Sequence, residues 1–126
     1  MKKSTEENVN LTEEEKLQKN IEDWKKQYYS IYEINIIGYR FIFRPLTRAE
    51  YKVLRKEAAA INENTDRNDR IDFRIENEEK MSKIATLYPE PEELKEIIEG
   101  CAGVADILSD NIMYYSGFSD EPVVKL

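Results

Sequence analysis

Apolar residues first recur at helical spacing. Four of them follow one another at steps of four, three and four residues: Leu17, Ile21, Trp24 and Tyr28. This spacing places them on one face of a helix. Residues Thr12 to Glu15 precede the stripe and have the pattern of a capping box, in which the Thr hydroxyl and a carboxylate three residues later satisfy free backbone amides. The pattern predicts a helix over about 12–29.

The period then changes to two residues, which is typical of strands. Residues 31–37 and 40–44 are rich in β-branched and aromatic side chains, and Gly38 and Tyr39 lie between them. A two-residue loop that begins with Gly fits a type II′ turn and predicts a hairpin. Its predicted register pairs Ile36 with Phe41, Ile34 with Phe43, Asn35 with Ile42, and Glu33 with Arg44. This register gives the hairpin one apolar face.

Further helices are predicted after the hairpin. Pro45 ends the second strand, and Thr47 to Glu50 form a second capping box. The predicted helices run from this cap to about 61, and over about 70–87, 91–100 and 103–115. The inward stripe of the second of these is assigned to Ile71, Ile75, Ile84 and Tyr88, with Met81 and Leu87 close to it. That of the last is assigned to Val104, Ile107, Leu108, Ile112 and Tyr115, with Gly117 closing the helix.

These elements predict an α+β fold, a mostly α-helical single domain of about five helices with one β-hairpin packed on them. Two strands alone are not stable in water, so the hairpin needs a cover from the helices or from another chain. We expect residues 1–10 to form a flexible N-terminal tail, 11–118 the domain, and 119–126 a loose C-terminal tail.

Composition and charge narrow the function. The 126 residues include 19 Lys and Arg against 26 Asp and Glu, a net charge of -7, with no His and one Cys. An acidic chain is unsuited to a nucleic-acid backbone. One Cys forms no internal disulfide, and without His there is no zinc site. The apolar stretch 31–43 is interrupted by charged residues and predicts no membrane span. No signal peptide is evident, so we expect a cytoplasmic protein.

The sequence contains no pattern that predicts a catalytic site or a metal site. Asn64, Asp66 and Asn68 have the spacing of a calcium loop, but Asp69 stands where Gly is needed and Ile75 where a bidentate Glu is needed. Without His, a nucleophile would need a rarer base, and no carboxylate pair or phosphate-binding Gly-rich loop stands out. We therefore expect no catalytic residues, no metal and no cofactor.

The order of motifs resembles a known family. It is carried by Trp24 to Tyr29, by Phe43-Arg44-Pro45-Leu46-Thr47-Arg48-Ala49-Glu50-Tyr51, by Leu87-Tyr88-Pro89, by Ala102-Gly103-Val104 and by Ser116-Gly117-Phe118. Across residues 15–118 the chain resembles small proteins of the tail gene cluster of tailed bacteriophages, especially tail assembly chaperones, and less specifically baseplate components.

The resemblance implies a non-enzymatic protein of phage tail morphogenesis. A tail assembly chaperone binds the tape measure protein and often has a second, frameshifted form. The alternative that the resemblance leaves open is a structural tail or baseplate subunit of the virion. The implied partners are other tail proteins (tape measure, tube or baseplate) or a second copy in a homo-oligomer. The implied location is the bacterial host cytoplasm during assembly, or the virion tail.

Two apolar regions are candidates for a partner surface. In the predicted hairpin, Ile31, Ile37 and Ile42 lie on the face opposite the core, which a single helical layer leaves uncovered. The alternative is that the first helix covers one face and the C-terminal helices the other, which would bury the patch within the monomer. Aromatic residues gather at both ends of the helical part, where they either pack into the core or anchor a partner. They are Trp24, Tyr28, Tyr29, Tyr32, Tyr114, Tyr115 and Phe118. The predicted partner-binding residues are Tyr29, Ile31, Tyr32, Ile37, Arg40, Ile42 and Arg44.

Overall fold

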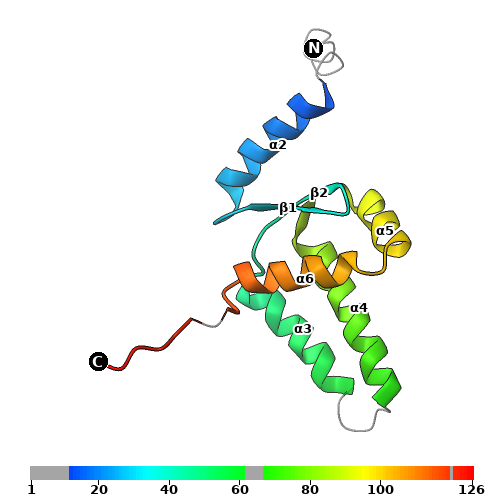
Figure 1. Ribbon diagram of the computed structural model, residues 1–126, viewed down its shortest axis with the longest axis vertical. Helices are drawn as coiled ribbons and strands as arrows, with labels where there is room; N and C mark the ends of the chain where they lie inside the picture. Colours follow the sequence, from blue (N-terminus) through cyan, green and yellow to red (C-terminus); the bar gives the residue numbers. More distant parts are fainter. Residues whose placement is uncertain (1–11, 62–66, 120) are drawn as a thin grey trace. The chain divides into compact units, whose positions relative to one another are not determined.

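The computed structural model describes residues 12–61, 67–119 and 121–126 (Figure 1). The chain divides into two compact units, one ending at Ile31 and the other beginning at Tyr32, and each is described by itself. The described part of the first unit is helix α2 (Glu13–Gln27) with the residues that flank it.

Helix α2 begins where the capping box predicts. The Thr12 hydroxyl accepts a hydrogen bond from the Glu15 amide at 3.1 Å, and the first turn carries three glutamates, which suits the positive end of the helix dipole. Leu17 is buried, and Ile21 and Trp24 are half-buried. The predicted helix and its inward stripe are therefore confirmed, with an end two residues earlier than expected.

The second unit contains the sheet and the remaining helices. Its elements in chain order are β1 (Tyr32–Ile36), β2 (Tyr39–Phe43), α3 (Arg48–Ile61), α4 (Arg67–Ala85), β3 (Thr86–Tyr88), α5 (Pro91–Gly100) and α6 (Val104–Tyr115). The described part of the chain thus has five helices and a three-stranded antiparallel sheet in the order β1-β2-β3. The predicted α+β class is confirmed.

The hairpin forms, but its predicted register is wrong by two residues. The loop is Ile37-Gly38, with φ of 47° and 83°, and positive φ at both central positions indicates a type I′ turn. The observed pairs are Tyr32 with Phe43, Glu33 with Ile42, Ile34 with Phe41, Asn35 with Arg40, and Ile36 with Tyr39. A shift of two residues preserves the faces. Ile36, Phe41 and Phe43 are buried in the core as expected, with Ile34 packed against it.

A third strand was not predicted. Helix α4 ends at Ala85, and β3 pairs with β2, opposing Tyr88 to Ile42 and Thr86 to Phe43 across a local irregularity. Residues 86–88 are too few to display a period of two, so they read as the end of a helix. Because of β3, the strand β2 is central and not an edge of the sheet.

Helix α4 lies at the centre of the helical layer, and α3, α5 and α6 all pack against it (Figure 1). The stripe predicted for it is wrong. Ile75 and Ile84 are exposed. Met81, which was placed close to the stripe, is buried, and so are Ser82 and Ala85, which were not assigned to it. Ser82 is tolerated there because its hydroxyl donates to the Glu78 carbonyl at 2.9 Å. The side chain of Ile71 lies outside the described residues.

Helix α6 shows the same use of small residues. Val104, Leu108 and Ile112 are buried as predicted, but Ile107 and Tyr115 are exposed. Their expected place in the core is taken by two smaller residues, Ala105 and Ser109, and the Ser109 hydroxyl donates to the Asp106 carbonyl at 3.1 Å. The buried arc of α6 is therefore turned away from Ile107, which leaves apolar side chains on its outer face.

The core lies between one face of the sheet and the helices. Its members are Ile36, Phe41, Phe43, Leu46, Leu54, Met81, Ala85, Leu94, Ile97, Ile98, Val104, Ala105, Leu108 and Ile112. Pro91 begins α5 and Gly100 ends it, as predicted. Residues 64 and 66 of the calcium-like spacing, and the expected tail 1–10, lie outside the described residues.

Candidate functional site

Two residues of the predicted partner surface are not available to a partner. Ile42 is only 2% exposed, so the patch that it was to form with Ile31 and Ile37 does not exist as predicted. Ile42 lies on the central strand, between Glu33 on β1 and Tyr88 on β3. Arg44 does not face Glu33 and is instead bound to Glu50 through two hydrogen bonds of 2.8 Å.

Two other hairpin residues of the predicted partner surface, Ile37 and Arg40, are at least partly exposed. Ile37 is 64% exposed at the tip of the turn. Arg40 is half-buried and forms the ion pair with Glu33, at 2.6 Å, that the sequence had assigned to Arg44. Of the predicted patch, the turn residue Ile37 is therefore the part that the second unit exposes.

The remaining predicted residues are divided between the two units. Tyr29 is fully exposed and Ile31 half-buried, and both belong to the first unit. Tyr32 begins the second unit, where it stacks on Phe43 at 5.6 Å and on Tyr115 at 4.3 Å between ring centroids. The seven predicted residues therefore do not all belong to one compact unit.

The aromatic residues at the end of α6 make a better candidate. Tyr114 is 57% exposed, Tyr115 43% and Phe118 44%. Tyr114 meets Tyr115 edge to face, with ring centroids 4.9 Å apart. These three residues, which we call the aromatic surface, are held in place by neighbouring rings and still present much of their area to solvent.

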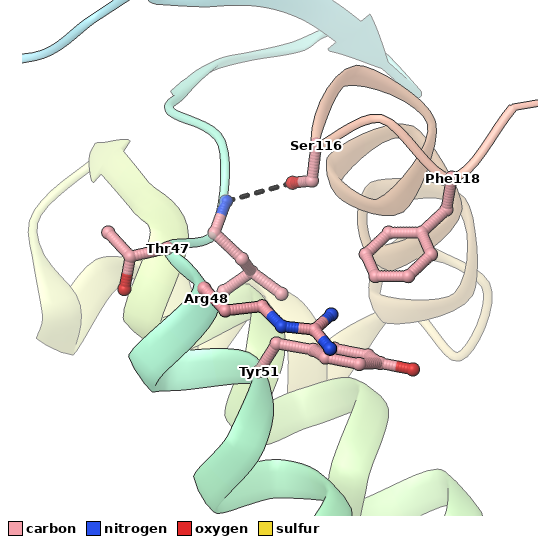
Figure 2. A pocket seen from close by; sticks show the side chains of 6 residues that line it. Thr47, Arg48, Tyr51, Ser116 and Phe118 are labelled. Atoms are coloured by element: carbon pink, nitrogen blue, oxygen red, sulfur yellow. Dashed lines mark hydrogen bonds between the residues drawn. The ribbon is translucent and has the colours of Figure 1, made fainter.

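Beside the aromatic surface lies a small pocket of about 150 Å³ (Figure 2). It is lined by Leu46, Thr47, Arg48, Tyr51, Ser116 and Phe118. The lining comes from two segments seventy residues apart, the start of α3 and the end of α6. The Ser116 hydroxyl joins them by accepting a hydrogen bond from the Leu46 amide at 2.8 Å.

A helix-ending motif positions one wall of the pocket. After α6, Gly117 has a φ of 100°, the left-handed conformation that Gly adopts at low cost. The Phe118 amide donates to the Met113 carbonyl at 3.1 Å and the Gly117 amide to the Tyr114 carbonyl at 3.2 Å. This is the hydrogen-bond pattern of a Schellman motif. It turns the chain so that the Phe118 ring lies 4.7 Å from the Tyr51 ring.

The second capping box fixes the opposite wall. The Glu50 amide donates to the Thr47 hydroxyl at 3.2 Å, and the Thr47 amide donates to the Glu50 carboxylate at 2.9 Å. Both halves of the predicted box are thus present. The Arg44 guanidinium, assisted by the Thr47 amide, lowers the pKa of Glu50 to about 2, against the opposing effect of burial.

Arg48 supplies the charge of the pocket. Among the described residues that line it, Arg48 alone is charged. Its guanidinium carbon lies 5.6 Å from the centre of the Tyr51 ring, within the range of a cation–π contact. Figure 2 shows the guanidinium lying along this ring. The pocket therefore combines aromatic walls with an exposed cation.

A second electrostatic feature lies between α4 and α6. Burial, together with a hydrogen bond and charge repulsion from Asp106, raises the pKa of Glu78 to about 7. Asp110 acts in the same direction, and Arg74, whose nitrogen lies 3.7 Å from the Glu78 carboxylate, acts in the opposite one. In the described part of the chain, no three acidic or Cys side chains are grouped so that they could hold a metal ion.

The pocket could not have been found from the chain alone. Its local parts were visible, because the Thr47 cap and the Gly117 helix end were both predicted. Phe118 was noted as one of an aromatic group, and Tyr51 as the last residue of the motif that begins at Phe43. What brings them together is a contact between the two ends of a long segment, and no local pattern encodes that contact.

Comparisons with family models, curated proteins and solved structures gave no match for this chain. Among the helices of the described residues, none has the length and apolar character needed to cross a membrane.

Proposed function

We propose that this protein acts by binding other proteins during the assembly of a bacteriophage tail, as a tail assembly chaperone in the host cytoplasm. The order of motifs from Trp24 to Phe118 supports the tail-gene assignment. The single observation that supports a binding role is the aromatic surface, since Tyr114, Tyr115 and Phe118 remain exposed at the end of α6. Aromatic side chains with both apolar area and polar groups are frequent anchors of protein interfaces.

Two features make this surface suitable for a partner. Tyr115 is stacked on Tyr32, and Phe118 lies against Tyr51, so little side-chain freedom remains to be lost on binding. The surrounding rings also give the surface a stable shape. A partner that covers these rings removes apolar area from water without reorganising the fold.

Co-purification with tail proteins tests the proposal. We expect the protein, produced together with the tape measure, tube and baseplate proteins of the same phage, to retain the tape measure protein on an affinity column. Tyr114→Ser should reduce the amount retained at least tenfold. Tyr39→Ser is a matched control, because Tyr39 is 44% exposed at the start of β2 and is not one of the three residues of the aromatic surface. Equal retention by both variants would contradict a binding role for the aromatic surface.

Mass spectrometry of purified virions separates the chaperone from the alternative role. A chaperone leaves the tail after assembly, so its peptides should be absent from virions that contain the other tail proteins. Detection at a fixed copy number would instead establish a structural tail or baseplate subunit. The capped and closed helices around Thr47 and Gly117 suit a permanent component of that kind.

A further inference from the structure

We propose that the pocket between α3 and α6 binds a carboxylate carried next to an aromatic ring, as in an acidic and aromatic segment of a partner protein. The chemical class of the ligand, an aromatic ring with a carboxylate, is inferred from the pocket alone. Its assignment to a segment of a partner protein rests on the proposed function. The size of the pocket suits such a ring. A cavity of about 150 Å³ is of the order that accommodates one benzene ring.

The walls suit an aromatic ring. Tyr51 and Phe118 contribute ring surfaces, and Leu46 contributes an aliphatic side chain. Aromatic rings favour offset or edge-to-face contact with a third ring. Figure 2 shows the Phe118 ring coming from the end of α6 and the Tyr51 ring coming from α3. A ring that enters the pocket therefore meets apolar surface on more than one side.

The pocket is also formed before any ligand arrives. The Leu46–Ser116 hydrogen bond, the capping box at Thr47 and the Schellman motif at Gly117 each fix the backbone of one part of the lining. Little conformational freedom is then lost on binding. A small ligand can consequently bind at this site with measurable affinity.

The charge selects an anion. The chain carries a net charge of -7, yet the pocket's charged lining residue is a cation, Arg48. Unlike Arg44, which is held by Glu50, Arg48 forms no hydrogen bond or ion pair with the described residues. A guanidinium has five donors in a planar fork that matches a carboxylate. Its position over Tyr51 fixes the direction in which a ligand carboxylate would lie.

The test is a titration of the ¹⁵N-labelled full chain with two pairs of small ligands, followed by backbone amide resonances. The first pair is N-acetylphenylalanine and its amide, which differ only in the carboxylate. The second is acetyl-Asp-Phe-amide and acetyl-Asn-Phe-amide, which represent an internal protein segment. We expect both acids to shift the amides of Arg48, Ser116 and Phe118, with affinities roughly tenfold above those of their neutral counterparts.

Variants identify the group that selects the acid. Arg48→Gln should abolish the preference for the acids and leave the weak binding of the neutral ligands. Arg55→Gln removes an exposed arginine of the same helix and should change neither. The amide spectrum of each variant also reports whether it is folded, and the ligand pairs test the proposal on the unaltered protein, independently of any variant.

Three results would overturn the proposal. The first is equal affinity for acid and neutral ligand, which would remove the role of Arg48. The second is shifts that do not map to the pocket. The third is binding of N-acetylphenylalanine without acetyl-Asp-Phe-amide, which would assign the pocket to a small free acid and not to a partner segment. Loss of tape measure binding in Tyr114→Ser concerns the proposed function separately, since Tyr114 does not line the pocket.

Discussion

The pKa values of two glutamates in the same unit are shifted in opposite directions by their surroundings. Glu50, near the start of α3, receives hydrogen bonds from Arg44 and from the Thr47 amide, and its pKa falls to about 2. The pKa of Glu78, in the middle of α4, rises to about 7 because of burial, followed by the hydrogen bond and charge of Asp106 and, least of all, the charge of Asp110. Both carboxyl groups are partly buried, so the difference comes from the charges and donors around them.

The comparison separates local from tertiary control of a charge. Part of the environment of Glu50 is set within four residues by the capping box, and Arg44 is only six residues away. Glu78 acquires its environment when α6 packs against α4, which brings acidic side chains of the two helices together. A helix cap can therefore stabilise an ionised carboxylate through residues close to it in the sequence. Packing of two acidic helices instead places carboxylates near one another, and the fold tolerates their repulsion.

The strongest test of the comparison removes Arg44. Arg44→Met leaves the Glu50 carboxylate partly buried without its two guanidinium donors, and it also removes the donor to the Ile84 carbonyl. We expect the free energy of unfolding to fall by about 3 kcal/mol, as for other partly buried pairs that lose one partner. Urea denaturation at pH 7 measures the change.

Arg40→Met is the matched control. Its ion pair with Glu33 is slightly shorter, at 2.6 Å against 2.8 Å, but the two side chains are more exposed, at 33% and 46% against 12% and 27%. Such pairs contribute about 0 to 1 kcal/mol. An equal decrease in the free energy of unfolding for Arg40→Met and Arg44→Met would mean that burial of the Glu50 ion pair does not add to its contribution to stability.

The second test uses pH. In the unfolded chain both glutamates titrate near 4.5. Because folding lowers the pKa of Glu50, its contribution is present above pH 4.5 and is lost as the pH falls towards 2. Folding raises the pKa of Glu78, so its contribution is complete below pH 4.5 and is lost as the pH rises through 7. Stability should therefore decline between about pH 5 and pH 8 on account of Glu78.

Glu78→Gln removes this decline. The variant should be more stable than the parent at pH 8 by on the order of 1 to 2 kcal/mol, because solvent screening at this partly exposed carboxyl reduces the effect of the pKa shift. At pH 4.5 the two should differ little. Thermal unfolding across this range measures the effect. Glu76→Gln, an exposed position on the same helix, changes the net charge equally and should leave the slope unchanged. If Glu76→Gln reduces the pH dependence of stability as much as Glu78→Gln does, the decline is caused by the net charge of the protein and not by Glu78.

The third test weakens the cap and spares the ion pair. Thr47→Ala removes the acceptor of the Glu50 amide and should cost about 1 kcal/mol of stability, the usual effect of losing an N-cap. Thr47→Ser retains the hydroxyl and should cost much less. Urea denaturation compares the two variants. A loss in Thr47→Ser as large as in Thr47→Ala would show that the methyl group matters and the cap does not.

The same distinction between local and tertiary control explains what the sequence could predict. Both capping boxes and the Gly117 helix end depend on a few consecutive residues, and all were predicted. The turn was misplaced because a β-branched residue, Ile37, adopts positive φ, which is uncommon for that residue type. We predicted a loop of Gly38 and Tyr39, whereas the observed loop is Ile37 and Gly38. This displacement of the turn by one residue shifts the predicted register by two.

Other errors came from packing. Ser82 and Ser109 are buried although polarity predicts an outer position, because each hydroxyl is satisfied by a carbonyl of its own helix. Ile75, Ile84 and Ile107 were consequently assigned to the wrong face. The burial of Ile42 depends in part on β3 as a neighbour of β2, and the pocket depends on α6 ending beside α3. Neither arrangement has a signature in the local pattern.

The test with the smallest expected effect separates the contributions of Asp106 and Asp110 to the pKa of Glu78. Asp106 contributes both a hydrogen bond and a charge to the raised pKa, whereas Asp110 contributes the weakest of the effects and through charge alone. Asp106→Asn should therefore lower the pKa of Glu78 clearly, and Asp110→Asn should lower it only slightly. The carboxyl ¹³C resonance of Glu78, followed by NMR as a function of pH, measures both changes. A larger fall in Asp110→Asn than in Asp106→Asn would mean that the hydrogen bond does not govern this group. Repulsion spread over the acidic face of α6 would then be the cause, and the contrast with Glu50 would be one of net charge and not of specific partners.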